Sequence, residues 1–185
     1  MATEKTVSLS AEAKAVAARV GSLRDFLDYL GEHDQCVTWP DAILPEPDIR
    51  NISVAAGNNV STGPAVIFDK IRGYPGKRVA VNVHGSFGNL ALLLGMSKTT
   101  PVRELFFEII RRWGSDKPLL ERVAPEKAPV NENRVDKNIN LYDLLPLYRI
   151  NANDGGFYIG KACVVSRYPL EPYNFGKLNV GIYRI

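Results

Sequence analysis

The residues best suited to chemistry lie in the sequence LNVGIYRI at positions 178–185. Asn179 offers a neutral amide oxygen that suits a hard cation, and Arg184 offers a planar guanidinium that fits a carboxylate or a phosphate. The apolar composition of this stretch predicts a β-strand, on which residues five apart point to opposite faces. A functional pair and an ordinary strand with an exposed arginine are both compatible with this pattern, and spacing alone favours the ordinary strand.

Other places in the sequence offer weaker candidates. The DGG turn at 154–156 places a carboxylate beside two glycines. His84 ends a predicted strand just before GSFGN, where an anion can bind, but the stretch lacks the glycine spacing of phosphate-binding loops. His33 follows a predicted helix and has no second histidine at ligand spacing, so we expect a solvent-facing residue at the helix end rather than a metal ligand.

The composition limits the class of protein. The chain has 185 residues, of which 45% are apolar and 23% charged, as in a globular protein with one domain or with one domain and part of a second. A net charge of +3 with interspersed signs gives no reason to expect nucleic acid or an anionic membrane as a partner. Since no segment has the pattern of a signal peptide or of a membrane span, we expect a cytoplasmic protein.

The cysteines give no indication of a metal site or a disulfide framework. Cys36 and Cys163 are far apart and lack the close pairs that zinc sites use. Cys163 lies in the apolar run ACVV, so we expect it to be a buried free thiol.

Cap residues and apolar spacing predict an α/β organisation for the first part of the chain. Ser10 and Ser22 precede the helix-forming runs AEAKAVAARV and LRDFLDYLGEH. Pro101 opens an amphipathic helix, VRELFFEIIRRW. We expect that helix to bury Leu105, Phe106, Ile109 and Ile110. Further helices are expected at 48–57 and after Ser86, and strands at 35–39, 64–71 and 78–85.

The composition changes after residue 113. Residues 114–139 are polar and rich in proline, which predicts a linker or an extended crossing. A short helical turn should follow within 140–150, and then two strands at 157–168 and 178–185. Because an isolated two-stranded hairpin is marginal in water, we expect the chain to be part of a longer protein.

A family resemblance becomes visible when these segments are read together. The string DGGFYIGKACVVSRYPLEPYNFGKLNVGIYRI resembles the UbiD-like decarboxylases, and most narrowly the C subunit of the non-oxidative hydroxyarylic acid decarboxylases that act on 4-hydroxybenzoate or vanillate. The same pattern is followed by LRDFLDYL, GPAVIFDKIRGYPGKRVAVNVHGSFGNLALLLGM, TPVRELFFEIIRRW and INLYDLLPLYRINANDGGFY. The resemblance extends over residues 22–185.

The resemblance implies an α/β (α+β) fold in which an N-terminal α/β domain precedes a split β-barrel that binds flavin. On this basis residues 1–21 are an N-terminal extension, 22–114 the α/β domain and 115–139 a linker, and 140–185 begin the barrel without completing it. The implied cofactors are prenylated FMN, a divalent metal, usually Mn²⁺, and K⁺.

The resemblance also implies roles for single residues in the motif N-x-G-I-Y-R. Asn179 would coordinate the metal that holds the cofactor phosphate, and Ile182 and Tyr183 would run past the cofactor. Arg184 would lie beside the cofactor and the substrate carboxylate as the catalytic arginine. In the family, the metal-binding His and Glu and the proton-donating Glu follow this motif, and these 185 residues do not include them.

The expected function is therefore the N-terminal part of a prenylated-FMN-dependent, non-oxidative decarboxylase of hydroxylated aromatic acids, inactive as this polypeptide alone. The alternatives are a non-catalytic assembly or binding module, or a truncated product of such an enzyme. The expected partners are an aromatic carboxylic acid, further copies of the chain and small accessory subunits, without nucleic acid or membrane.

Overall fold

The computed structural model describes residues 7–113, 123–159, 162–167 and 178–183. Its main sheet has three strands in the order β1-β2-β3: β1 (Cys36–Thr38), β2 (Ala65–Phe68) and β3 (Val79–Val81). β1 runs parallel to β2, and β3 runs antiparallel to it, so the sheet is mixed. The predicted mixed α/β class is confirmed for this part of the chain, with all three strands inside their expected ranges.

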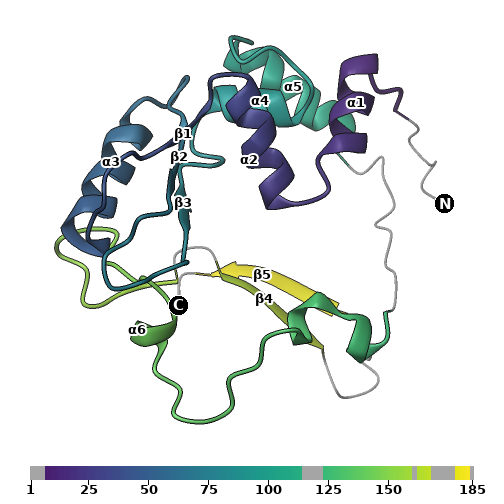
Figure 1. The fold of residues 1–185 in the computed structure, drawn as a ribbon. Coiled ribbons are helices and arrows are strands. Elements are labelled where there is room, and N and C mark those ends of the chain that lie inside the picture. The colour runs from purple at the N-terminus through teal and green to yellow at the C-terminus, as the bar shows by residue number, and fades with distance from the viewer. Residues whose placement is uncertain (1–6, 114–122, 160–161, 168–177, 184–185) are drawn as a thin grey trace.

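Helices cover both faces of this sheet (Figure 1). α3 (Arg50–Asn58) lies on one face, and α2 (Leu23–Glu32) with α4 (Phe87–Leu93) lies on the other. The predicted serine caps are confirmed, because the hydroxyl oxygens of Ser10, Ser22 and Ser86 each accept a hydrogen bond from the backbone three residues later. The remaining helices are α1 (Ala11–Arg19), α5 (Val102–Arg112) and α6 (Leu141–Leu144).

The helix expected at 48–57 begins differently from the prediction. A kinked turn at Pro45–Ile49, in which Glu46 is extended, leads into α3, which starts at Arg50. The carboxylate of Asp48 accepts a hydrogen bond from the backbone N–H of Leu44 at 2.9 Å, so it closes the turn before α3. The proline-rich crossing therefore leads into the helix through a kink at Glu46.

The sheet has an apolar core on each side because β2 is buried along most of its length. On the α3 side, six residues pack together: Ile43, Ile49, Val66, Phe68, Ile71 and Val81. On the opposite side, Phe26 and Leu30 of α2 meet Ala65 of β2 and Leu92 of α4. Such continuous burial is typical of a strand between two helical layers.

The helix α1 packs against the α/β domain. Ala13 and Val16 are buried. Gly95 has φ of +70°, and a Cβ atom built on it would lie 2.5 Å from the Cα of Ala13. The guanidinium of Arg111 donates to the carbonyl oxygen of Ser8 at 3.0 Å. Part of the expected N-terminal extension therefore rests on the segment that joins α4 and α5.

The predicted buried stripe of α5 is only partly right. Leu105 is buried and Ile109 is half-buried, but 57% of Phe106 and 48% of Ile110 are exposed. The spacing of the apolar residues predicted the helix correctly. Burial also depends on what packs against them, and among the described residues α5 meets the domain through its Leu105 side.

The second part of the chain contains the expected hairpin, formed by β4 (Ala162–Arg167) and β5 (Leu178–Tyr183). These strands pair antiparallel in a two-stranded sheet of their own. Residues 157–159, expected to begin the first strand, are not in a strand. Cys163 is exposed, so the prediction of a buried thiol was wrong. The apolar run ACVV predicted the strand correctly, but no described segment covers Cys163.

The described residues outside these elements are short turns and extended chain. Within the predicted linker, Pro125–Lys127 and Pro129–Asn131 form 3-10 turns. No helix in the described part of the chain has the length and apolar character needed to cross a membrane.

Candidate functional site

The residues of the N-x-G-I-Y-R motif lie on β5, which is held by a regular ladder to β4. The backbone of Asn179 pairs with Ser166, that of Ile182 with Cys163 and that of Tyr183 with Ala162. Arg184 lies outside the described residues. The structure thus places three of the four predicted site residues on one strand.

The donor set of this strand suits part of a metal site. An amide oxygen such as that of Asn179 is a ligand that Mn²⁺ accepts. The described residues contain no group of three or more His, Cys, Asp or Glu placed to hold a metal ion. A metal role for Asn179 stays a prediction, because its side chain lies outside the described part of the structure.

Gly181 is the position on β5 that has no side chain. It lies between Asn179 and Ile182, pairs with Val164, and is half-buried. A glycine inside a strand marks a bulge or a place where a ligand or another backbone comes close. The ladder is regular from Leu178 to Tyr183, so Gly181 marks no bulge.

A groove of about 580 Å³ lies where the α/β domain meets the segment that leads to β4. One wall is β3 with the turn after it, and the other is the stretch 145–150 with Tyr158 and Ile159. The walls are mainly aliphatic, and polar groups come from Ser53, Arg78, Asn82, His84 and the two tyrosines, Tyr148 and Tyr158. Apolar walls with a few polar groups are typical of small-molecule sites.

Asn82 shapes the floor of this groove, and the sequence gave no prediction for it. Its φ is +55°, and its side-chain nitrogen donates to the carbonyl oxygens of Gly63 at 3.1 Å and Pro64 at 3.0 Å. A Cβ atom on Gly85 would lie 1.8 Å from its Oδ1. The buried side chain of Asn89 donates back to the Asn82 carbonyl at 3.2 Å. The asparagines and glycines of VNVHGSFGN are the signal that could have indicated such a turn.

Both histidines occupy structural positions. The ring of His84 stacks on Phe26, with centroids 5.3 Å apart and an angle of 17° between the planes. His33 caps the end of α2 and is half-buried, and its Nδ1 lies 2.8 Å from the carbonyl oxygen of Tyr29. His33 is therefore less exposed than predicted. Neither histidine belongs to a metal-binding group among the described residues.

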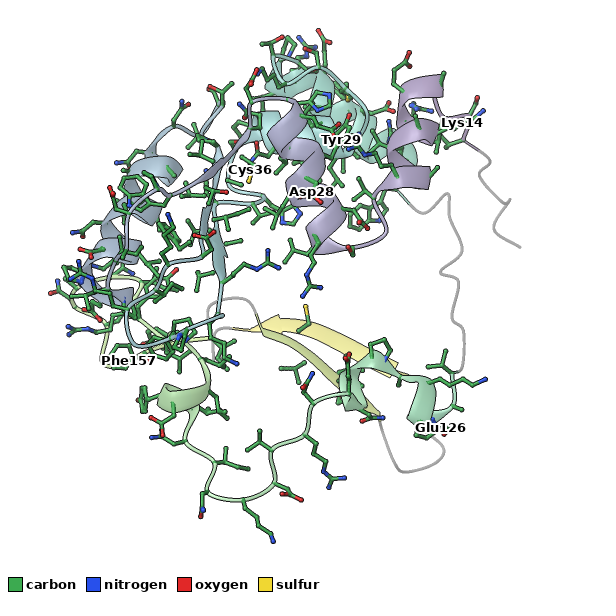
Figure 2. The ribbon with its side chains drawn as sticks, viewed as in Figure 1. Lys14, Asp28, Tyr29, Cys36, Glu126 and Phe157 are labelled. Atoms are coloured by element: carbon green, nitrogen blue, oxygen red, sulfur yellow. The ribbon has the colours of Figure 1, made fainter. Side chains whose placement is uncertain are left out.

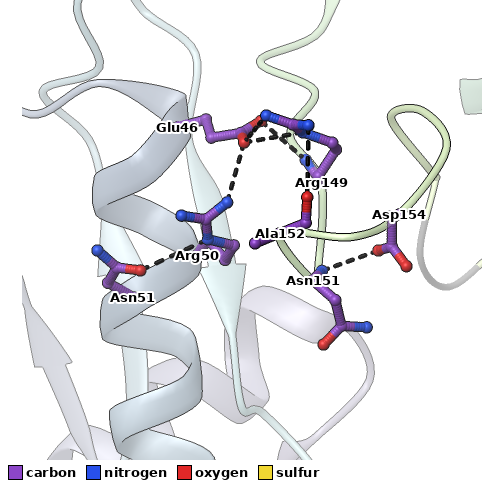
Figure 3. Close-up of polar contacts among 7 residues, drawn as sticks. All are labelled: Glu46, Arg50, Asn51, Arg149, Asn151, Ala152 and Asp154. Carbon is purple, nitrogen blue, oxygen red and sulfur yellow. Dashed lines mark hydrogen bonds and ion pairs between the residues drawn. The ribbon is translucent and has the colours of Figure 1, made fainter.

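The DGG turn is closed by its own carboxylate (Figure 3). Asp154 accepts a hydrogen bond from the backbone N–H of Asn151 at 2.8 Å, and its own N–H donates to the Asn151 carbonyl at 3.1 Å. The side chain of Asp154 thus stabilises the turn before β4, as Asp does in many turns.

Two family models match the chain. The 3-octaprenyl-4-hydroxybenzoate carboxy-lyase N-terminal domain matches residues 27–109, and the Rift-related domain of the same carboxy-lyase matches residues 121–185. A phenolic acid decarboxylase from Sedimentibacter hydroxybenzoicus is 48% identical over 163 residues, which are 88% of this chain and 34% of that protein. The chain therefore spans about a third of the length of the curated relatives it matches.

Solved structures agree with these matches. The open form of the Sedimentibacter hydroxybenzoicus vanillic acid decarboxylase ShVdcCD superposes with a TM-score of 0.78 at 48% identity, over 88% of this chain and 35% of that one. The UbiD-class enzyme HmfF from Pelotomaculum thermopropionicum, in complex with FMN, gives a TM-score of 0.65 at 25% identity, over 88% and 33%. The α/β domain, the hairpin and both family matches lead to one conclusion: this chain belongs to the UbiD carboxy-lyase family.

Proposed function

We propose that these 185 residues are the N-terminal part of a prenylated-FMN-dependent, non-oxidative decarboxylase of hydroxylated aromatic acids of the 4-hydroxybenzoate or vanillate type. The observation on which this proposal rests is the match of 88% of the chain, at 48% identity, to a phenolic acid decarboxylase. The flavin in the HmfF complexes supports the cofactor assignment.

The proposed organisation follows the change of character along the chain. Residues 1–21 are an extension, 22–114 the α/β domain, 115–139 a linker and 140–185 the first part of a split β-barrel. The separate β4–β5 sheet supports this division because it shares no strand with the main sheet.

Each residue of the motif has a distinct role in the proposed site. When bound, prenylated FMN would supply an electrophilic centre for the aromatic ring, and Mn²⁺ and K⁺ are the proposed accompanying ions. Asn179 offers its amide oxygen to the divalent metal, and the backbone of Ile182 and Tyr183 lines the cofactor. Arg184 holds the substrate carboxylate through a charge-assisted, two-pronged contact, which fixes the orientation of the acid.

The proposed partners follow from the family. They are an aromatic carboxylic acid, further copies of the chain and small accessory subunits, in a cytoplasmic protein. The relative ShVdcCD, named for two components, supports the accessory subunits.

A chimera tests the proposal directly. These 185 residues would replace the matching segment of the Sedimentibacter hydroxybenzoicus vanillic acid decarboxylase, and release of carbon dioxide from vanillic acid would be measured. We expect the chimera to turn over and the 185 residues alone to be inactive, because the relatives are about three times longer. Arg184→Ala in the chimera should lower kcat/KM about a hundredfold, whereas the exposed-site control Lys137→Ala should not. A folded, flavin-loaded chimera without turnover, or an active Arg184→Ala variant, would contradict the proposal.

An assembly module is the second candidate, and the exposed apolar face of α5 favours it. Phe106, Phe107 and Trp113 are 57%, 55% and 79% exposed. Large exposed apolar surface is typical of interaction sites. Size-exclusion chromatography of the chain distinguishes the candidates, since a clean monomer at high concentration argues against a module that assembles through α5.

A further inference from the structure

An ion pair between Glu46 and Arg149 joins residues that are 103 positions apart in the chain (Figure 3). The carboxylate of Glu46, in the turn before α3, accepts from Nε of Arg149 at 2.9 Å and lies 2.6 Å from its Nη2. The other oxygen of Glu46 accepts from the backbone N–H of Arg149 at 3.3 Å. One side chain therefore holds both the guanidinium and the main chain of Arg149, which fixes a segment rather than a single side chain.

The contact continues on both sides of this pair. Arg50, four residues after Glu46, donates at 3.0 Å to Oε1 of Glu46, the oxygen that also accepts from Nε of Arg149. Arg50 thus orients this carboxylate from α3. On the far side, Nη1 of Arg149 donates to the carbonyl oxygen of Ala152 at 3.4 Å, next to the turn that Asp154 closes. A continuous path of hydrogen bonds thus runs from α3 to the DGG turn.

The pair belongs to a larger contact between the two regions that the family models match. Tyr148 packs against the core that contains Ile49 and is hydrogen-bonded to Ser53 of α3. The hydroxyl of Tyr74 donates to the carbonyl oxygen of Tyr142 at 2.6 Å. Together these contacts hold the stretch 142–149, which includes part of one wall of the groove, against the α/β domain.

We propose that Glu46 is a positioning residue: by holding Arg149, it sets where the segment that leads into the β4–β5 hairpin lies on the α/β domain. Asn179 lies on that hairpin, and the second part of the proposal is that its position depends on Glu46, a carboxylate outside the flavin-binding region. The link to catalysis rests on the proposed function, whereas the mechanical link from Glu46 to the segment does not.

The local charges favour this arrangement at neutral pH. The hydrogen bond from Arg149, with further contributions from its backbone and from the charge of Arg50, holds the pKa of the Glu46 carboxyl below its usual range. Only 16% of the Glu46 side chain is exposed, against 41% for Arg149. The carboxylate is therefore the more buried partner of the pair, and the arginine is the more exposed one.

Hydrogen exchange measured on the whole chain without cofactor tests the mechanical link. In Glu46→Gln, amides between Leu147 and Phe157 should exchange about tenfold faster, while those of α2 and β2 keep their rates. The matched control is Glu108→Gln, which removes a carboxylate paired with two arginines inside α5. That control should leave residues 147–157 unchanged. Equal exchange of this segment in wild type and Glu46→Gln overturns the proposal.

A double variant separates positioning from general loss of stability. If the two side chains act through each other, Glu46→Gln with Arg149→Met should exchange no faster than the faster single variant. Additive increases would mean that the residues act independently, and the proposal would fail.

The same measurement on the chimera with the vanillic acid decarboxylase, with FMN and Mn²⁺ added, distinguishes this inference from the proposed function. Wild type should gain protection in 178–183, Glu46→Gln should need about tenfold more ligand for the same gain, and Asn179→Ala should gain none. Absence of any gain in wild type counts against the flavin site but leaves the exchange result for 147–157 intact. An equal gain in Glu46→Gln at the same ligand concentration overturns the link from Glu46 to the hairpin.

Discussion

At the scale of single residues, Gly95 is the position where one added methyl group should do most harm. Its φ of +70° already disfavours any other residue, and a Cβ atom would lie 2.5 Å from the Cα and 2.6 Å from the backbone nitrogen of Ala13. Gly73 has a similar φ of +84° with nothing within 4 Å of its Cβ position. The two glycines therefore separate backbone strain from the docking of α1.

Gly95→Ala should lower the free energy of unfolding by about 2–3 kcal/mol, because strain and displacement of α1 add. Gly73→Ala should cost only about 1 kcal/mol, from the backbone alone. Urea unfolding of both variants measures the difference. Equal losses would mean that α1 does not press on Gly95 as described.

The carboxylate of Glu108 gives the stability of the α/β domain a defined pH dependence. Hydrogen bonds from Arg111 and then Arg112 lower its pKa from 4.5 to about 2. A carboxyl with a lowered folded-state pKa stabilises the protein above its unfolded-state pKa, and this contribution is lost as pH falls from 4.5 towards 2. Glu108→Gln should therefore flatten the fall in the urea midpoint over that window and leave its shape at higher pH unchanged. A steep fall of the same size in the variant would refute this assignment.

The two cysteines should differ in reactivity. Cys163 on β4 is exposed, whereas Cys36 is half-buried and its thiol pKa is raised by burial and by the carboxylate of Asp28. Because the thiolate is the reactive form, a disulfide reagent at neutral pH should modify Cys163 about tenfold faster. Cys163→Ser should remove the fast phase and Cys36→Ser the slow one. A fast phase that survives in Cys163→Ser would show that β4 is covered.

At the scale of elements, α5 has one side that holds the fold and another that does not. Leu105→Ala should cost about 2–5 kcal/mol, since it opens a cavity beneath the helix. Phe106→Ala should change stability by no more than about 0.5 kcal/mol, because 57% of that side chain is already in solvent. Thermal unfolding of both variants tests the orientation of the helix. Similar losses at the two positions would mean that the face of Phe106 is covered.

Local signals predicted the elements well. The sequence predicted the caps Ser10, Ser22 and Ser86, because capping depends on a few neighbouring residues. Each hydroxyl makes the expected hydrogen bond. The exposure of Phe106 and Cys163 could not be predicted from the sequence, because burial depends on segments far away in the chain.

The same limit applies to the candidate site. The motif around Asn179 was visible as a strand with polar residues, and the hairpin confirms the strand. The contact of Glu46 with Arg149 could not be predicted, because one of many glutamates and arginines had to be chosen across 103 positions. The role of Asn82 could not be predicted either, because it requires a positive φ, which only the folded structure shows.

At the scale of the whole molecule, the structure is an α/β domain with a docked segment and a separate hairpin. The side chains of Figure 2 illustrate the division, with Tyr29 and Cys36 among the helices and sheet and Phe157 on the segment that leads to the hairpin. The groove lies where these parts meet. Under the proposed function, these parts form one side of a site, and the other side comes from the two thirds of its relatives that this chain does not match.

The manganese content of the purified chimera tests the central claim most directly. The claim is that β5 carries a metal ligand, Asn179, into a flavin site. The account predicts that the chimera retains manganese and flavin, that Asn179→Ala loses most of the manganese, and that Asn131→Ala, whose side-chain amide donates to the carbonyl oxygen of Pro125, retains it. An Asn179→Ala chimera that keeps its manganese and its turnover of vanillic acid would contradict the account.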